Sequence, residues 1–251
     1  MGRRLGQHFL VRESTLARIA SAALGDKHEG PVIEIGPGKG ALTKHLLDRA
    51  SRVIAIEVDS YLVHYLRQKF RDRPNLEIVE ADVLKTDLGG WGPATIAGNL
   101  PYYITSPILD RVYAATGWTR AVFLIQKEVA ERLTAQPGSR DYGYLTAHTE
   151  LFSRPEYLFT VPPAAFKPPP KVDSAVVRLT PRDPAAEWGI PDAAPFLAFA
   201  SAAFRQKRKT LRNNLRESYP LIEGSAQASL RAEQLSFPEL VNLYRAVQRV
   251  E

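Results

Sequence analysis

The segment Pro-Val-Ile-Glu-Ile-Gly-Pro-Gly-Lys-Gly at residues 31–40 joins a short apolar run to a turn with three glycines. A helical pattern follows the turn, with Leu42, Leu46 and Leu47 on one face. A second apolar run, RVIAIEV at residues 52–58, leads into another amphipathic helical stretch. Strand, glycine turn, helix and strand in this order predict the opening of a parallel β-sheet with helices packed on its faces.

The same alternation continues toward the middle of the chain. Further short apolar runs, separated by helical stretches, are LEIVE (76–80), ATIAG (94–98) and AVFLIQ (121–126). After about residue 135 the pattern changes, because EYLFTV (156–161) and DSAVVRL (173–179) are joined by a proline-rich loop with no helix between them. These two runs predict a hairpin at one edge of an α/β sheet.

The C-terminal part of the chain has a different pattern. Residues 181–195 are rich in Pro, Ala and Asp and predict a linker. Only helical patterns follow it, at 196–218, about 226–233 and 237–249. We therefore expect an α/β domain at residues 1–185 and a small all-helical domain at residues 190–251.

The composition of the 251 residues is that of an ordinary globular protein, with 45% hydrophobic and 24% charged residues. The chain has no cysteine, which excludes disulfide frameworks, thiolate zinc sites and cysteine nucleophiles. There are 33 Lys and Arg against 27 Asp and Glu, so the net charge is +6 and favours an anionic partner such as nucleic acid or a membrane surface. The five histidines show no metal-ligand spacing, and we expect no metal.

The sequence predicts neither a membrane-spanning segment nor a signal peptide. No apolar run approaches the roughly 20 residues that span a bilayer. The apolar stretch HFLV near the N-terminus is too short for a signal peptide. We therefore expect a cytoplasmic protein with no membrane partner, and nothing in the sequence predicts an oligomer rather than a monomer.

The glycine turn and an acidic residue beyond it indicate a nucleoside-binding site rather than a tight turn with an incidental acid. Gly36 and Gly38 let the backbone turn sharply and let a ligand approach it. Glu57 lies 21 residues after Gly36, where a carboxylate can accept hydrogen bonds from ribose hydroxyls. The Gly-x-Gly-x-Gly spacing differs from the Gly-x-Gly-x-x-Gly expected for NAD. With Glu34 two residues before the first glycine, it resembles the first motif of S-adenosylmethionine methyltransferases.

Two further segments follow predicted strands directly. The apolar run at 76–80 is followed closely by Asp82 and Val83, where a carboxylate and a backbone N–H suit an adenine ring, although Asp82 alone would predict a helix cap. The apolar run ATIAG at 94–98 is followed by Asn-Leu-Pro-Tyr at 99–102. As a bare tetrapeptide this would predict only a turn. In this place it resembles the Asn/Asp-x-Pro-Tyr/Phe motif of amino-methyltransferases.

The chemistry of adenine N6 explains these residue types. Its lone pair is delocalised into the ring, so the amine is a poor nucleophile. Hydrogen bonds from its N–H groups to the Asn99 amide oxygen and the Leu100 carbonyl would favour a tetrahedral nitrogen with a localised lone pair. Pro101 would stiffen the turn, and Tyr102 would stack on the base. The rate gain would come mainly from positioning and electrostatics, because no strong base is needed.

Segments near both ends of the α/β region complete a resemblance to a known family. They are Gly-Gln-His-Phe-Leu at 6–10 and Phe-Lys-Pro-Pro-Pro-Lys-Val-Asp-Ser at 166–174. With the glycine turn and the 99–102 segment, they resemble the ribosomal RNA adenine N6-dimethyltransferases over essentially the whole chain, and among these the bacterial small-subunit branch. The resemblance implies a Rossmann-like class I methyltransferase fold, with a seven-stranded sheet whose last strand is antiparallel and a small helical domain after it.

The resemblance also implies S-adenosylmethionine as the cofactor and assigns site residues. The expected cofactor-binding residues are Gln7, His8, Leu10, Glu34, Gly36, Gly38, Glu57, Asp82, Val83 and Asn99. The expected catalytic residues are Asn99, Leu100, Pro101, Tyr102 and Phe166. Phe166 would stack on the target base opposite Tyr102. Only the resemblance suggests this role, since an aromatic ring among prolines otherwise predicts packing.

The predicted helical domain carries a basic run between residues 204 and 214, with no acidic residue until Glu217. Its cations are Arg205, Lys207, Arg208, Lys209 and Arg212. A charge run often marks only a solvated face, but the family resemblance favours contacts with an RNA backbone. The resemblance implies 16S rRNA within the immature small ribosomal subunit as the partner.

The leading hypothesis is an enzyme that transfers methyl groups from S-adenosylmethionine to N6 of two adjacent adenosines near the 3′ end of 16S rRNA, giving N6,N6-dimethyladenosine during small-subunit maturation. A second hypothesis is the same chemistry on 23S rRNA, as in the erythromycin-resistance methyltransferases. A third is a ribosome-assembly factor that keeps the fold while catalysis is dispensable. The glycine spacing disfavours an NAD-dependent dehydrogenase.

Overall fold

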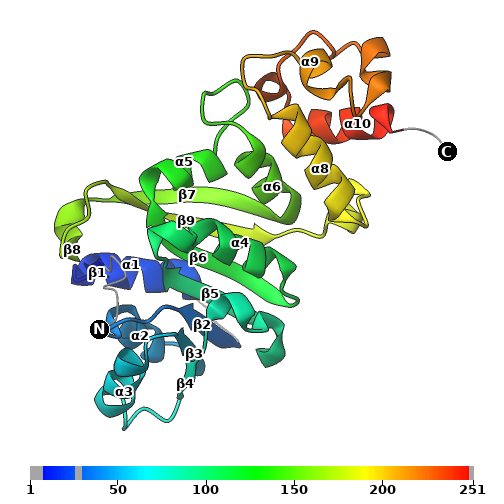
Figure 1. Cartoon of the computed structure of the whole chain (residues 1–251). Helices are drawn as coiled ribbons and strands as arrows, with labels where there is room; N and C mark the ends of the chain where they lie inside the picture. The colour runs from blue at the N-terminus through cyan, green and yellow to red at the C-terminus, as the bar shows by residue number, and fades with distance from the viewer. Residues whose placement is uncertain (1–7, 26–29, 249–251) are drawn as a thin grey trace. The chain divides into compact units, whose positions relative to one another are not determined.

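The computed structural model describes residues 8–25 and 30–248 (Figure 1). The chain forms two compact units. The first contains the residues up to Ala130 together with 156–181, and the second contains 131–155 together with the residues from Arg182 onward. Residues 131–155 therefore group with the C-terminal helices, whereas the domain limits predicted above place them in the α/β domain. Those limits remain a prediction.

Seven strands of the described residues form one mixed sheet in the order β4-β3-β2-β5-β6-β9-β7 (Figure 1). Strands β2 to β6 run parallel, and β9 is antiparallel to β6. The bounds are β2 Pro31–Ile35, β3 Arg52–Glu57, β4 Leu76–Glu80, β5 Ala94–Asn99, β6 Trp118–Gln126, β7 Ser153–Val161 and β9 Ser174–Pro181. The predicted seven-stranded α/β fold is confirmed, and so is the pairing of the last two strands at one edge.

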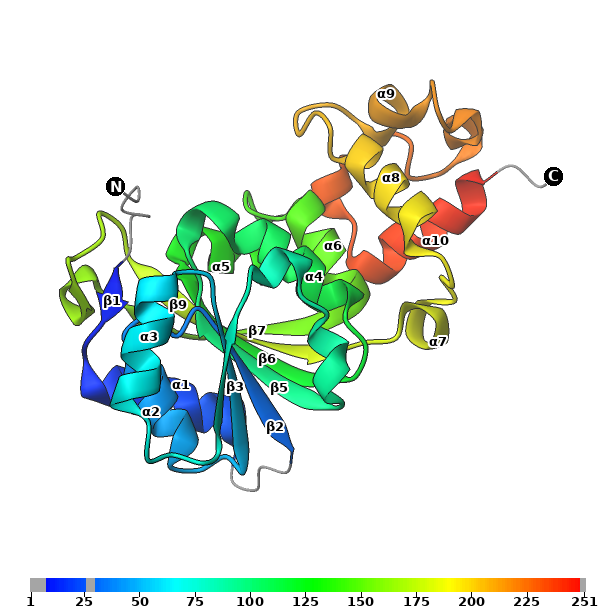
Figure 2. The same cartoon turned by 60° about the horizontal axis from the view of Figure 1, so that its bottom comes forward.

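Continuous apolar strands make up the centre of this sheet. Val32, Ile33 and Ile54 are fully buried, and Ile33 lies between Ile54 and Ile96 in the strand register. Such runs suit a parallel sheet that is covered on both faces. Figure 2 shows α1 and α2 on one face and α4 on the other. The helix bounds are α1 Glu13–Leu24, α2 Ala41–Leu47, α3 Ser60–Lys69, α4 Thr105–Ala114 and α5 Lys127–Leu133.

Aspartates that follow the strands begin the next helical elements. Asp59 accepts hydrogen bonds from the backbone N–H groups of Tyr61 and Leu62 and so begins α3. Asp82 accepts one from Leu84 at 3.0 Å and begins η1. The short 3₁₀ helices of the first unit are η1 Val83–Lys85, η2 Leu88–Trp91, η3 Tyr102–Ile104 and η4 Pro163–Ala165.

A second, two-stranded sheet joins distant parts of the first unit. Strand β1, Phe9–Leu10, pairs antiparallel with β8, Phe166–Lys167. Leu10 lies opposite Phe166 in this pairing. The pairing brings the N-terminal motif beside the proline-rich motif that precedes β9.

The second unit packs short helices around an aromatic core. Phe196, Phe199 and Phe237 are almost fully buried, and the rings of Phe196 and Tyr244 meet edge to face with centroids 5.3 Å apart. The elements of this unit are α6 Tyr144–Phe152, α7 Pro184–Trp188, α8 Ala193–Ala203, α9 Leu211–Leu215, α10 Phe237–Val247, η5 Pro220–Gly224 and η6 Ala232–Gln234.

The stretch predicted as one helix at 196–218 is broken in the structure. Helix α8 ends at Ala203, and α9 begins only at Leu211. The Asn214 amide donates to the Ala203 carbonyl at 2.7 Å and to the Gln206 carbonyl at 3.2 Å. A side chain therefore satisfies carbonyl groups that a continuous helix would have bonded internally, and the chain can leave the helix there.

Two other expectations for the C-terminal part are wrong. The helix predicted near 226–233 is present only as turns and the short η6. The predicted linker contains α7, because Asp183 caps it and Pro184 stands in its first turn. Among the helices of the described residues, none has the length and apolar character needed to cross a membrane.

Candidate active site

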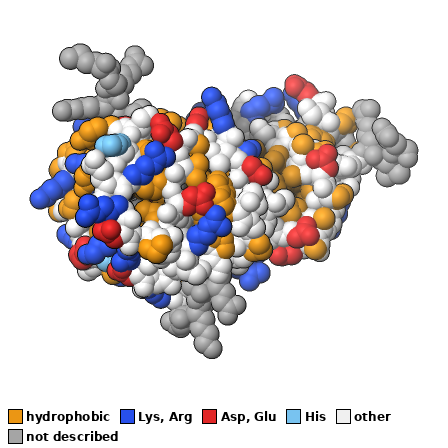
Figure 3. Space-filling view, turned by 90° about the horizontal axis from the view of Figure 1, so that it is seen from below, with side chains coloured by type: hydrophobic (Ala, Val, Ile, Leu, Met, Phe, Trp, Pro, Cys, Tyr) orange, Lys and Arg blue, Asp and Glu red, His pale blue; other side chains and the backbone are white. Residues whose placement is uncertain are grey.

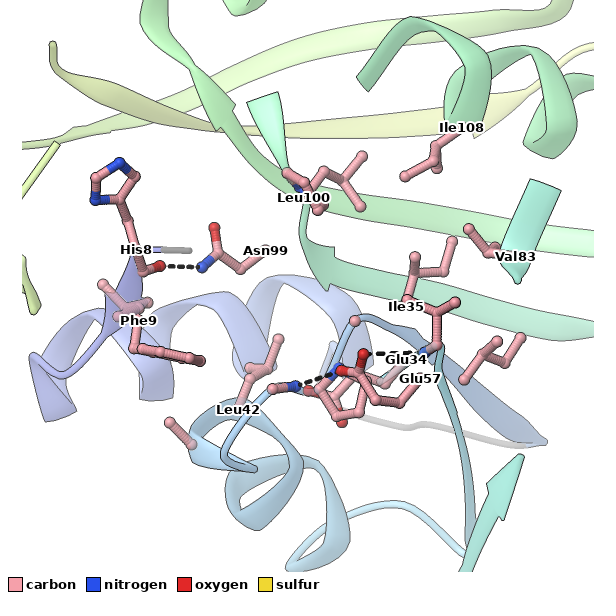
Figure 4. A pocket seen from close by; sticks show the side chains of 18 of the residues that line it. His8, Phe9, Glu34, Ile35, Leu42, Glu57, Val83, Asn99, Leu100 and Ile108 are labelled. Atoms are coloured by element: carbon pink, nitrogen blue, oxygen red, sulfur yellow. Dashed lines mark hydrogen bonds between the residues drawn. The ribbon is translucent and has the colours of Figure 1, made fainter. Parts of the chain in front are cut away.

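A cavity of about 230 Å³ opens at the carboxyl ends of β2, β3, β4 and β5 (Figure 4). Ligands of open α/β sheets bind at this edge. The predicted site residues that line the cavity are His8, Leu10, Glu34, Gly36, Gly38, Glu57, Asp82, Val83, Asn99, Leu100, Pro101 and Tyr102. Gln7 lies outside the described residues. The fold thus brings the N-terminal motif, the glycine turn and the 99–102 segment to one place.

The glycine turn after β2 uses a backbone conformation that favours glycine. Gly36 and Gly38 have φ angles of 66° and 58°, in the left-handed region. A Cβ at Gly36 would meet no atom within 4 Å, so conformation rather than space requires glycine there. A Cβ at Gly38 would lie 3.1 Å from the Phe9 ring. The turn therefore leaves its backbone open to a ligand at Gly36.

The Glu57 carboxylate holds this turn against the end of β3. Its Oε2 accepts a hydrogen bond from the Gly38 N–H at 3.1 Å, and its Oε1 accepts one from the Val58 N–H at 2.9 Å (Figure 4). Oε1 also accepts from the Asp59 N–H at 3.1 Å. The side chain is 5% exposed. A carboxylate has about four acceptor positions. One position therefore remains for a donor such as the ribose hydroxyl predicted for this residue.

Glu34 supplies a second carboxyl group to the cavity and is 1% exposed. Burial raises its pKa to about 7; the polar groups of Thr43 oppose this rise, and the negative charge of Glu57 adds to it. The Oε2 atom is buried and has no hydrogen-bond partner among the described residues. An unpaired buried acceptor beside a cavity fits a ligand that brings a donor, and a cationic donor would favour the ionised carboxylate.

Glu34→Gln is expected to stabilise the cofactor-free protein at pH 8 and to change its stability little at pH 4. The pKa of Glu34 is raised from 4.5 to about 7 in the folded chain. In the pH window between these two values the folded chain therefore keeps a proton on Glu34 that the unfolded chain has released. The free energy of unfolding therefore falls as the pH rises through the window, by about 3 kcal/mol in total. The glutamine side chain of the variant does not ionise, so its stability does not fall in this way. Urea unfolding of both proteins at the two pH values measures the effect, and the same stability difference at both would contradict it.

Asn99 ends β5, and its amide is oriented by the N-terminal motif. The Nδ2 atom donates to the His8 carbonyl at 3.1 Å, which leaves Oδ1 as an acceptor (Figure 4). The Leu100 N–H donates to the Leu124 carbonyl at 3.0 Å, and no described residue donates to the Leu100 carbonyl. Two acceptors on neighbouring residues are therefore available, as the predicted role toward an amine requires.

Tyr102 is half-buried and lies between the other two motifs. Its hydroxyl is hydrogen-bonded to Ser174 Oγ at 2.6 Å, and burial raises the pKa of this hydroxyl. Its ring and the His8 imidazole have centroids 6.0 Å apart and planes at 28°. His8 Nδ1 is hydrogen-bonded to the Pro168 carbonyl at 2.9 Å. The N-terminal, 99–102 and proline-rich motifs are thus joined around one tyrosine.

Phe166 does not border the cavity in this conformation, and its stacking role remains a prediction. Its side chain is 2% exposed and packs in the core that contains Leu10 and Leu16. A ring must offer a free face to stack on a base. In this conformation Phe166 is a packing residue, and stacking opposite Tyr102 would require the ring to leave the core.

The five cations of the predicted basic run are all exposed and belong to the second unit. Arg212 forms an ion pair with Glu223 at 3.1 Å, and Lys207 donates to the Arg140 carbonyl at 2.8 Å. The cations of the run without a carboxylate partner among the described residues are Arg205, Lys207, Arg208 and Lys209. Figure 3 shows basic and acidic side chains interspersed on the face in view, so any RNA contact there depends on local clusters.

Several cavity residues were missed because they carry no motif of their own. Phe9 stands between two predicted residues, and Lys39 Nζ lies 5.0 Å from its ring centroid. Tyr103, Ile104 and Ile108 line the cavity beyond the 99–102 segment. Ile104 ends η3 and Ile108 lies in α4, so neither a motif nor the period of a single helix marks them as a pair.

Comparisons with known proteins agree with this site. The family described as ribosomal RNA adenine dimethylase matches residues 2–246. The chain is 44% identical to the ribosomal RNA small subunit methyltransferase A of Acidobacterium capsulatum, over 98% of this chain and 90% of that protein. It is 39% identical to the protein of the same name from Pseudomonas putida, over 96% of this chain and 92% of that protein.

Solved structures are similar over both units. A dimethyladenosine transferase from Plasmodium falciparum has a TM-score of 0.81 at 27% identity, covering 94% of this chain and 96% of that one. The 23S rRNA methyltransferase ErmE has a TM-score of 0.77 at 30% identity, covering 96% of this chain and 100% of that one. The family match includes the whole cavity and the 99–102 segment. The chain therefore belongs to the ribosomal RNA adenine dimethylase family.

Proposed function

We propose that this protein transfers methyl groups from S-adenosylmethionine to N6 of two adjacent adenosines near the 3′ end of 16S rRNA, giving N6,N6-dimethyladenosine while the small subunit matures. The observation that carries the proposal is the Asn99 amide, fixed by the His8 carbonyl so that its oxygen stays free beside the cavity. Relatives named as small-subunit methyltransferases, 44% and 39% identical, support this substrate branch. The protein would act in the cytoplasm, as a monomer, on the immature small subunit.

The described residues fit S-adenosylmethionine. When bound, this cofactor supplies an electrophilic methyl group on a sulfonium sulfur. Glu34, whose Oε2 is buried without a partner, would accept from the cofactor ammonium group, and Glu57 would accept from a ribose hydroxyl. Asp82 and the Val83 N–H would hold the adenine. Asp82 already uses Oδ1 to accept from the Leu84 N–H, so Oδ2 is the oxygen left for the ligand.

The 99–102 segment would act on the target amine. Asn99 Oδ1 and the Leu100 carbonyl would accept the two N–H groups of adenine N6, which localises the nitrogen lone pair for attack on the methyl group. The φ angle of −61° at Pro101 is set by its ring and keeps the turn stiff. No strong base is needed, because the methylated nitrogen is acidic and loses its proton to water. The target base must be unpaired or flipped from its stack to reach these acceptors.

Methyl transfer to purified ribosomal subunits tests the substrate. With labelled S-adenosylmethionine and subunits from cells that lack dimethyladenosine, label is expected in the small-subunit RNA. The similarity to ErmE makes 23S rRNA the second candidate, and label only in large-subunit RNA would change the substrate while keeping the chemistry. No label in either RNA, with cofactor binding confirmed, would favour the assembly-factor hypothesis.

Reversing Arg208 and Lys209 to Glu is expected to weaken RNA binding about tenfold at moderate salt, because phosphate contacts are lost. Both side chains are exposed and belong to the second unit, so the affinity for S-adenosylmethionine should not change. Reversal of Arg67 and Arg71, two exposed cations of the first unit, gives the same net charge and serves as the control. An equal loss in both double variants, or no loss in either, would contradict a specific contact by the basic run.

A further inference from the structure

Tyr103 stands at the mouth of the cavity, directly after the 99–102 segment. It lies in η3, borders the cavity and is 61% exposed. Its side chain makes no hydrogen bond, ring contact or cation contact with any described residue. A large ring that borders a ligand cavity without packing on the fold has a face free for a ligand.

The other aromatic rings of this region are already engaged. Tyr102 is half-buried, hydrogen-bonded through its hydroxyl and close to the His8 ring. Phe9 is partly buried, and Phe166 is 2% exposed in the core. Among the described aromatic residues around the cavity, Tyr103 is therefore the one that presents an exposed ring to solvent.

We propose that Tyr103 forms a stacking subsite for the nucleobase next to the target adenosine. The proposal rests on the proposed function, in which the target base leaves its stack and enters past Tyr102 to reach Asn99. Removal of the target base uncovers one face of its neighbour. Tyr103 follows Tyr102 directly and stands at the mouth of the cavity. Its ring can cover the uncovered face of the neighbouring base while the target base is inside the cavity. Stacking tolerates any base, so this subsite positions the RNA and does not read its sequence.

Tyr103 is on this account a positioning residue, and its removal should affect RNA rather than cofactor. Tyr103→Ala is expected to raise both the KM and the Kd for RNA about tenfold, as the loss of one stacked base does. The Kd for S-adenosylmethionine should stay within twofold of wild type. Tyr103→Phe keeps the ring and should behave as wild type, because the hydroxyl has no partner. The matched control is Tyr61→Ala, at a tyrosine that is 76% exposed on α3 but does not border the cavity.

The test uses the full chain and a small-subunit RNA with 2-aminopurine at the nucleotide beside the target. The fluorescence of the bound RNA should be higher with Tyr103→Ala than with wild type or Tyr103→Phe, because unstacked 2-aminopurine is brighter. An unchanged RNA Kd in Tyr103→Ala would overturn the proposal, and so would an equal loss in Tyr103→Phe. A loss of cofactor affinity as large as the loss of RNA affinity would also overturn it, since the ring would then cover the cofactor.

These readouts separate the stacking subsite from the proposed function. The RNA Kd and the fluorescence do not depend on turnover, so they decide the role of Tyr103 even if wild-type protein transfers no methyl group. That last outcome would refute the proposed function alone.

Discussion

Asn99→Ala is expected to lower the kcat of methyl transfer by about 100- to 1,000-fold, the effect of removing one preorganised polar group from a reacting centre. The variant loses Oδ1, one of the two acceptors for the target amine, while the Leu100 carbonyl remains. It also loses the hydrogen bond from Nδ2 to the His8 carbonyl at 3.1 Å. That bond contributes only about 1 kcal/mol, so the protein should remain folded.

Asn99→Asp separates the two roles of this side chain. A carboxylate keeps an acceptor for the target amine but has no N–H to donate to the His8 carbonyl, so its kcat should fall between those of wild type and the alanine variant. Single-turnover kinetics at saturating RNA and cofactor measure the step, with circular dichroism as the folding control. A kcat for Asn99→Ala within threefold of wild type would contradict the assigned role.

Glu57→Ala is expected to weaken the binding of S-adenosylmethionine by at least about 100-fold and to lower the free energy of unfolding by about 3 kcal/mol. The carboxylate accepts from three backbone N–H groups, those of Gly38, Val58 and Asp59, and is 5% exposed. Alanine leaves these donors without an acceptor and releases the glycine turn from the end of β3. Isothermal titration with the cofactor and urea unfolding without it measure the two effects.

Glu80→Ala is the matched control for this variant. Glu80 lies beside Glu57 in the register, at the end of the neighbouring strand, but its side chain is exposed and accepts from the Ser60 hydroxyl. Its removal should change both quantities little. A Glu57→Ala protein with normal cofactor affinity would mean that the turn holds its shape without the carboxylate and that the ribose contact is absent.

The sheet is predictable from the sequence because its signals are local. The buried run at 31–35 and the positive φ angles at Gly36 and Gly38 depend on residues a few positions apart. Errors arise where a distant group decides the local structure. The helix predicted at 196–218 breaks because the Asn214 side chain reaches back to the Ala203 carbonyl, an interaction that apolar periodicity does not report.

In the candidate site, too, some features follow from the local sequence and others depend on distant parts of the chain. The motifs identify the residues that line the cavity, such as Glu34 and Asn99, because their types and spacing follow from the chemistry. The burial of Phe166 is not predictable in this way, since it accompanies the pairing of β1 with β8 across more than 150 residues of sequence. Tyr103 is missed for the opposite reason. It follows a motif without being part of it, and only its exposure at the cavity mouth marks it.

Nucleoside mass spectrometry of small-subunit RNA tests the central claim most directly. Small subunits that lack the modification are incubated with S-adenosylmethionine and either wild-type protein or Asn99→Ala, and the RNA is digested to nucleosides. We expect N6,N6-dimethyladenosine with wild-type protein and almost none with the variant. The absence of dimethyladenosine with wild-type protein, or equal amounts with both proteins, would contradict a methyl transfer that depends on the Asn99 amide.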